Sequence, residues 1–84
     1  MSEIMTIIRG IIIPVDWDKK GKVTGVAIFT PDEDEFLIEK DGKGNELIGL
    51  IHKEVEVEGV LKEVNHKKKI SVRKITSLVK GGEK

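Results

Sequence analysis

The 84-residue sequence contains no cysteine and no tyrosine, and aromatic residues make up only 4% of it. Without cysteine, the chain can form neither a disulfide framework nor a thiolate metal site. The shortage of aromatic side chains also leaves little material for the stacking platforms with which strong single-strand nucleic-acid binders hold bases. The stability of this protein must therefore come from side-chain packing and from strand pairing.

Net charge and long apolar runs are also absent. Fifteen lysine and arginine residues balance fifteen aspartate and glutamate residues, which removes the simplest argument for a polyanionic partner. No apolar run reaches the roughly 18–20 residues that a membrane helix needs. Glu3 and Arg9 flank or interrupt the isoleucine-rich start, and no small-residue cleavage site follows, so a signal peptide is not expected. We expect a cytoplasmic protein with no membrane partner, and a monomer by default.

Hydrophobic residues make up 38% of the chain and charged residues 36%, which is typical of a compact soluble domain. We expect one domain over residues 1–80 and a flexible tail over residues 81–84. The clearest pattern lies in residues 52–75, where apolar residues alternate with charged ones as in a hairpin with one buried face. Ile75 breaks this alternation, which indicates a bulge or a strand end. The whole pattern predicts five strands, near residues 5–16, 22–30, 35–40, 54–64 and 69–78.

Two further features shape the expected fold. The first strand is rich in isoleucine and has Gly10 at its middle, where a bulge or a sharp bend would allow it to pair at both ends. Between the third and fourth strands, Asn45 is a candidate cap for a short helix over residues 46–51. Leu47, Leu50 and Ile51 share one face of that helix and should be buried.

The hairpin formed by the second and third strands can be given a register. If it is symmetric about Glu33, Phe29 faces Leu37 and Ile28 faces Ile38. The inner face would then hold Val26, Ile28, Phe36 and Ile38, and the outer face Ala27, Phe29, Leu37 and Glu39.

Three strands, a short helix and two more strands is the order of the OB-fold, a five-stranded Greek-key barrel. The long strand with Gly10, the helix over residues 46–51 and the closing pattern around Gly59 and Val72 carry this likeness. The chain resembles small free-standing bacterial OB-fold proteins of unassigned function. An SH3-like barrel is the competing architecture, but it has no ready place for a helix before the fourth strand. The resemblance implies a mainly β barrel whose first and last hairpin loops flank a binding cleft.

Lysines concentrate in those two loops. Residues 16–22 carry a net charge of +1 and residues 65–69 a net charge of +3, whereas residues 32–35 carry −4. We therefore expect one basic and one acidic end. Trp17 could stack on a base while the lysines contact phosphates, or it could pack over the end of the barrel. Equally, the lysines could be ordinary solvated turn residues. The candidate nucleic-acid-binding residues are Trp17, Lys19, Lys20, Lys22, His66, Lys67, Lys68, Lys69 and Arg73.

An exposed apolar pair, Phe29 and Leu37, ringed by carboxylates, is the alternative site and would contact another protein. No cofactor or metal site is expected, since the two histidines are fourteen residues apart and lack cysteine partners. No nucleophile stands beside a general base, so we do not expect an enzyme. The leading hypothesis is a non-enzymatic OB-fold module that binds single-stranded nucleic acid; the alternative is a protein-interaction module.

Overall fold

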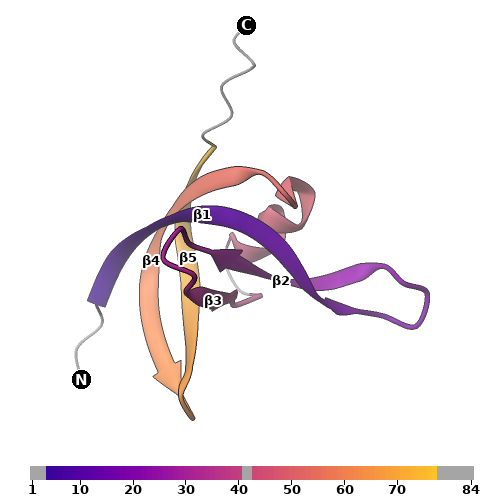
Figure 1. The fold of residues 1–84 in the computed structure, drawn as a ribbon, viewed down its shortest axis with the longest axis horizontal. Coiled ribbons are helices and arrows are strands. Elements are labelled where there is room, and N and C mark those ends of the chain that lie inside the picture. Colours follow the sequence, from indigo (N-terminus) through magenta and orange to yellow (C-terminus); the bar gives the residue numbers. More distant parts are fainter. Residues whose placement is uncertain (1–3, 41–42, 78–84) are drawn as a thin grey trace, which may run out of the picture.

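A computed structural model describes residues 4–40 and 43–77 of the chain. Its strands are β1 (Ile4–Trp17), β2 (Val23–Phe29), β3 (Glu35–Ile38), β4 (Glu54–Val64) and β5 (Lys67–Ser77), and the 3₁₀-helix η1 (Gly44–Leu50) lies between β3 and β4. The strands close into one barrel in the order β1-β2-β3-β5-β4 (Figure 1). The predicted five-stranded barrel with one short helix is confirmed, and the architecture is compatible with an OB-like fold. Residue 78 of the predicted last strand and the predicted tail lie outside the described residues.

Strand β1 closes the barrel because it pairs with two different strands. Residues 4–11 pair with β4, and residues 11–17 pair with β2. At Gly10, where the change of partner begins, a Cβ atom would collide with the backbone carbonyl of Phe29. Only glycine allows β2 to approach so closely. The pairing with β4 runs through Gly10 without a shift, so the predicted feature there is a bend, and the bulges of β1 lie instead between Pro14 and Trp17.

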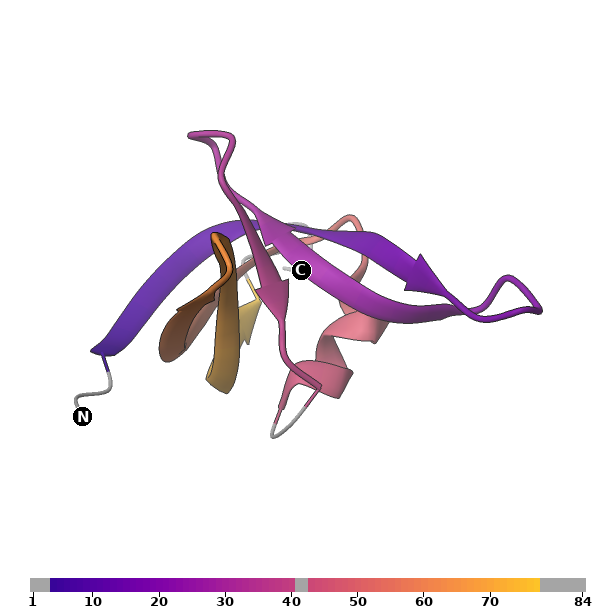
Figure 2. The same ribbon diagram turned by 90° about the horizontal axis from the view of Figure 1, so that it is seen from below.

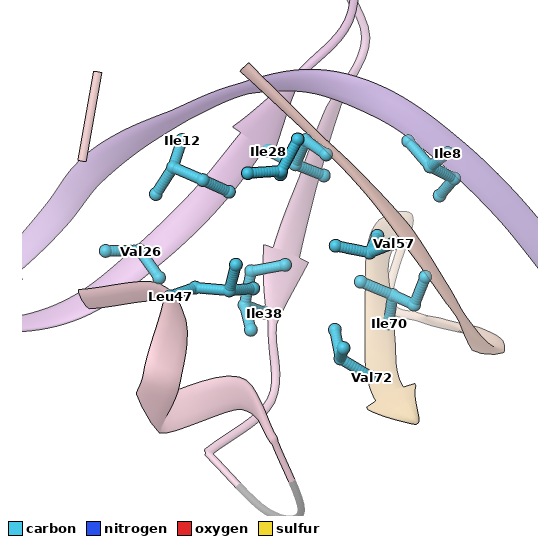
Figure 3. Packing of buried hydrophobic residues seen from close by; sticks show 10 residues of the cluster. Ile8, Ile12, Val26, Ile28, Ile38, Leu47, Val57, Ile70 and Val72 are labelled. Atoms are coloured by element: carbon cyan, nitrogen blue, oxygen red, sulfur yellow. The ribbon is translucent and has the colours of Figure 1, made fainter. Parts of the chain in front are cut away.

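The barrel interior is filled by aliphatic side chains from all five strands and from η1 (Figure 3). Alternation along β1 directs Ile8 and Ile12 inward, and both are buried. The predicted inner face of β2 and β3 is also found, with Phe36 half-buried against the core. The buried cluster consists of Ile8, Ile12, Val26, Ile28, Ile38, Leu47, Val55, Val57, Ile70 and Val72.

Ala27 was predicted on the outer face but is fully buried. It pairs with Ile13 on one side and with Leu37 on the other. These larger neighbours cover a side chain as small as a methyl group, so an outward position does not expose it.

The register predicted for the β2–β3 hairpin was wrong by two residues. Ala27, not Phe29, pairs with Leu37, and Ile28 pairs with Phe36. The turn is centred on Asp32 and not on Glu33: the Thr30 N–H donates to the Asp34 carbonyl at 2.9 Å, and the Glu33 N–H donates to the Thr30 carbonyl at 2.9 Å. Because the shift is an even number of residues, the inner and outer faces of both strands stay as predicted.

The β1–β2 turn repeats this geometry. The Asp18 N–H donates to the Lys22 carbonyl at 2.9 Å, and the Gly21 N–H donates to the Asp18 carbonyl at 3.1 Å. The fourth residue of each turn has a left-handed backbone, with φ of 84° at Gly21 and 68° at Glu33. Glycine adopts this conformation without steric cost, whereas glutamate does not.

Helix η1 begins earlier than predicted. Lys43 occupies the cap position with no side-chain cap bond, so the predicted cap at Asn45 was wrong. The helix starts at Gly44, where a Cβ atom would collide with the carbonyl of Glu39, so that only glycine fits at this position. Leu47 is fully buried, while Leu50 and Ile51 are half-buried and pack against the core.

The β4–β5 hairpin contains the bulge that the sequence indicated. The pairing shifts between Glu58 and Gly59, which leaves Arg73 as the extra residue in β5. Ile75 therefore returns to the core side and pairs with Val57.

Replacing Leu47 by alanine should lower the free energy of unfolding by about 2–5 kcal/mol, because a fully buried leucine leaves a cavity. Leu50→Ala is the matched control and should cost less, since Leu50 is half-buried. Urea unfolding of the two variants measures the difference. Equal losses would contradict the placement of η1.

Glu33→Gly should raise the free energy of unfolding by about 0.5–1 kcal/mol, because it removes a left-handed glutamate at the cost of a more flexible unfolded chain. Asp32→Gly changes the neighbouring residue of the same turn, which has no positive φ, and should be destabilising. Thermal unfolding of both variants tests this, and a destabilised Glu33→Gly protein would disprove the proposed strain.

Candidate binding surfaces

The β1–β2 hairpin carries the first group of predicted nucleic-acid-binding residues. Strand β1 continues to Trp17, which pairs with Val23, so the loop begins two residues later than expected. Trp17 is 54% exposed and is not packed over the end of the barrel. The Asp18 carboxylate accepts the N–H groups of Lys20 at 2.8 Å and Lys22 at 2.9 Å and so shapes the turn. The side chains of Lys19, Lys20 and Lys22 are exposed.

The β4–β5 turn carries the second group. Asn65 and His66 form a two-residue loop in which both φ angles are positive, 53° and 68°, as a type I′ turn requires. Strand β5 starts at Lys67, so the three lysines predicted in the loop lie in a strand. Lys67 and Lys68 are exposed, and Lys69 is half-buried.

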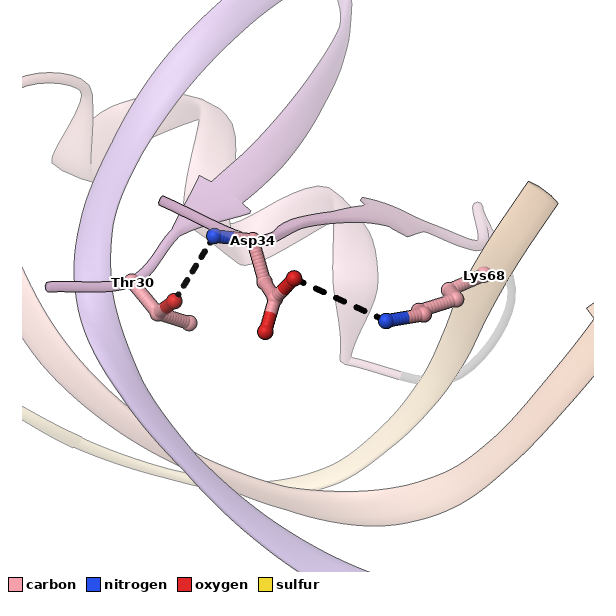
Figure 4. Close-up of polar contacts among 3 residues, drawn as sticks. All are labelled: Thr30, Asp34 and Lys68. Carbon is pink, nitrogen blue, oxygen red and sulfur yellow. Dashed lines mark hydrogen bonds and ion pairs between the residues drawn. The ribbon is translucent and has the colours of Figure 1, made fainter. Parts of the chain in front are cut away.

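The acidic β2–β3 turn and this basic turn meet, which makes the prediction of separate basic and acidic ends wrong. Lys68 Nζ lies 3.6 Å from Asp34 Oδ1 (Figure 4) and 5.3 Å from the centre of the Phe36 ring. The cause is the parallel pairing of β3 with β5 through Leu37 and Lys69, which places the segments that precede both strands at the same end. A groove of about 430 Å³ between them is lined by Glu33, Asp34, Glu35, Leu37, His66, Lys67 and Lys68.

A second groove, of about 360 Å³, continues from Leu37 and Lys69 to Asp16 at the base of the β1–β2 hairpin. Together the two grooves form a trough over the outer face of β2 and β3. Its walls hold five acidic residues as well as the lysines: Asp16, Glu33, Asp34, Glu35 and Glu39. The trough is therefore mixed in charge and does not form a basic channel.

The structure does not bring the two lysine groups together. The β1–β2 hairpin extends to one end of the molecule, whereas the β4–β5 turn lies toward the other end (Figures 1 and 2). Lys19, Lys20 and Lys22 line neither groove of the trough. Arg73 is exposed at the bulge of β5, within the strand and away from its turn.

A second exposed surface is formed by apolar side chains of β1 and of the C-terminal end of β2. Met5, Ile7 and Ile11 of β1 are 53%, 62% and 44% exposed, and Phe29 of β2 is 39% exposed. Ile11 and Phe29 are direct cross-strand neighbours. We call these four side chains the outer apolar face. Leu37, the expected companion of Phe29, is half-buried and diagonal to it, as the corrected register requires.

The exposure of three of these four residues, Met5, Ile7 and Ile11, was not predicted from the sequence. The first strand is there only isoleucine-rich with a bulge or bend at Gly10, and no solvent-facing side is assigned to it. The available signal was Arg9, which shares the odd-numbered side of the strand with Met5, Ile7 and Ile11. That charge marks the odd-numbered side as the solvent side.

The outer apolar face borders a groove of about 390 Å³, which is lined by Gly10, Ile11, Phe29, Thr30, Pro31, Glu33 and Glu54. Within the described residues, neither Glu33 nor Glu54 forms an ion pair, whereas nearby Arg9 lies 3.6 Å from Glu56. The groove thus has an apolar floor and two carboxylates without a partner cation.

The described residues contain no group of three or more histidine, aspartate or glutamate side chains placed to hold a metal ion. Nor does this part of the chain include a helix long and apolar enough to cross a membrane. Comparisons with models of protein families, with curated protein sequences and with solved structures found no match.

Proposed function

We propose that this protein is a non-enzymatic binding module that recognises another protein through the outer apolar face. The observation that carries the proposal is the exposure of four large apolar side chains on two adjoining strands. Exposed apolar patches of this kind, rimmed by polar residues, are typical of protein-interaction sites. Each Å² of apolar surface removed from water contributes about 25 cal/mol, so an isoleucine and phenylalanine cluster can anchor a partner.

The position of the face on the barrel supports this function. Ile7 and Ile11 alternate with the buried Ile8 and Ile12, so the core holds the strand that presents them. A binding surface on such a strand is ordered before the partner arrives, which lowers the entropic cost of association. The mixed charge of the trough, by contrast, gives a polyanion no continuous positive path.

Selection of binding peptides from a random library displayed on phage tests this proposal. Peptides selected on the full-length protein should lose at least roughly tenfold in affinity, about 1.4 kcal/mol, for an Ile7→Lys/Phe29→Lys variant. Val64→Lys is the matched control, because Val64 is also an exposed apolar strand residue but lies at the end of β4. Circular dichroism establishes that each variant is folded.

Selected peptides that bind both variants as tightly as the wild-type chain would place recognition elsewhere and refute the proposal. The same holds if several independent libraries yield no peptide that depends on Ile7 or Phe29.

A second candidate function, single-strand nucleic-acid binding, is favoured by the half-exposed Trp17 beside the lysines of the β1–β2 hairpin. The indole could stack on a base while Lys19, Lys20 and Lys22 contact phosphates. This arrangement needs only the hairpin, so it does not depend on the trough.

If the hairpin binds single strands, three phosphate contacts give a slope of log K against log salt of about −2. Lys19, Lys20 and Lys22 changed together to glutamine should flatten that slope, whereas Trp17→Ala should cost roughly 1–3 kcal/mol and leave it unchanged. The same triple change at Lys67, Lys68 and Lys69 is the control. Absence of any Trp17 fluorescence response to a single strand of about twenty nucleotides at about 20 mM salt, where screening is weak, would eliminate this candidate.

A further inference from the structure

The N-terminal half of β1 has a strand edge that no other strand covers within residues 4–40 and 43–77. Residues 4–10 pair with β4, and β2 joins β1 only from the pair Ile11 and Phe29 onward. Beyond that pair, β2 ends and the chain turns away. Figure 2 shows β1 and the β2–β3 turn running apart toward the N-terminal end of β1. In the described part of the chain, the second edge of residues 4–10 therefore has no strand beside it.

The hydrogen bonds of Ile12 show which backbone groups face this free edge. The Ile12 N–H donates to the Lys53 carbonyl at 3.2 Å, and the Ile12 carbonyl accepts the His52 N–H at 2.7 Å. Even-numbered residues of β1 thus direct their backbone groups toward the β4 side. Since this direction alternates along a strand, Met5, Ile7 and Arg9 direct theirs toward the free edge. Natural proteins usually shield such an edge, because it is a template for another strand.

The groove beside the outer apolar face begins where this edge begins. Gly10, Ile11 and Phe29 line it together with two carboxylates, Glu33 and Glu54, the latter being the cross-strand partner of Ile11 on β4. Nearby Arg9 is already paired with Glu56. Glu33 also lines the groove that holds Lys67 and Lys68, but within the described residues neither it nor Glu54 forms an ion pair, so an occupant that brought positive charge would meet two unpaired carboxylates.

We infer that the partner binds as an extended segment that carries lysine or arginine together with apolar side chains, and that it adds to the free edge of β1 as an extra strand. This inference rests on the proposed function and specifies the chemistry of the partner. The backbone of an extended segment satisfies the edge groups of Met5, Ile7 and Arg9. Its apolar side chains cover Ile7 and Phe29, and its cations meet Glu33 and Glu54.

A second copy of this chain fits the same edge less well. Antiparallel pairing of two β1 edges about Ile7 would place Arg9 of each copy opposite Met5 of the other. Arg9 is the sole cation that such an edge presents, and Glu56 already engages it. Glu33 and Glu54 would then stay without a partner.

Titration of the ¹⁵N-labelled full-length protein with two synthetic peptides tests the inference. In one peptide, lysine and valine take turns at every second position with threonine between them, so that both lie on one face of the added strand; the other peptide has glutamate in place of lysine. The lysine peptide should shift the amide signals of Met5, Ile7 and Arg9, and its affinity should fall as salt rises. The glutamate peptide should bind at least roughly tenfold more weakly, because its negative charges would be repelled by the carboxylates of Glu33 and Glu54.

Matched variants and modified peptides distinguish the contribution of the two carboxylates from that of strand addition. Glu33→Gln together with Glu54→Gln should weaken binding of the lysine peptide roughly three- to tenfold. Glu46→Gln together with Glu63→Gln makes the same change in net charge away from the groove and should leave the affinity unchanged. Peptides N-methylated at alternate residues, in both phases, test strand addition: one phase should abolish binding, because methylation removes the donors that face β1, and the other should retain it.

Unchanged affinity in the Glu33 and Glu54 variant, or binding of both N-methylated peptides, would overturn the inference. So would sedimentation of the free chain as a dimer that Ile7→Lys dissociates, since a second copy would then occupy the edge. If the lysine peptide fails but library peptides still depend on Ile7 and Phe29, the inference is wrong and the proposed function stands. If neither binds, both are wrong.

Discussion

The change of partner along β1 is the constraint on which the structure depends. One continuous strand pairs with β4 in its first half and with β2 in its second half, and this double pairing closes the barrel. It is possible because Gly10 has no side chain where the backbone of β2 passes over it. The core is then enclosed without disulfides by aliphatic side chains that alternate along every strand. The same geometry has a second result, since β2 covers only half of β1 and leaves an edge beyond Ile11.

Closure also decides how the charges are arranged. The parallel pairing of β3 with β5 places an acidic turn beside a basic turn, and Lys68 and Asp34 pair across the groove between them. Both side chains of this pair are about half exposed, so it contributes on the order of 0–1 kcal/mol to stability. The arrangement matters more for recognition, because it places carboxylates along the trough where the OB-fold resemblance predicted the binding of a polyanion. The lysines of the β1–β2 hairpin, Lys19, Lys20 and Lys22, line neither groove of this trough.

Two residues of the outer apolar face, Met5 and Ile7, lie on the segment of β1 that has the free edge. This proximity supports a role for both features in binding the same partner. An exposed isoleucine alone is ordinary on a protein surface. Here Met5 and Ile7 are exposed on a strand whose outer backbone groups have no neighbouring strand within the described residues, and Phe29 continues the apolar surface onto β2. Apolar contact and backbone hydrogen bonding can thus act on one ligand at one place, which is the requirement for recognition by strand addition.

The sequence by itself determined the strand order, the short helix between β3 and β4 and the inner faces of the hairpins, because alternation and turn residues are local properties of the chain. It also indicated a bulge or a strand end near Ile75, and the structure has a bulge at Arg73. It did not determine the β2–β3 register, since moving the centre of the turn by one residue shifts the pairing by two and leaves the alternation intact. Nor did it reveal that Lys68 meets Asp34 or that Ile7 is exposed. Those facts depend on which strands become neighbours when the barrel closes, and contacts between residues far apart in the chain are decided by tertiary structure alone.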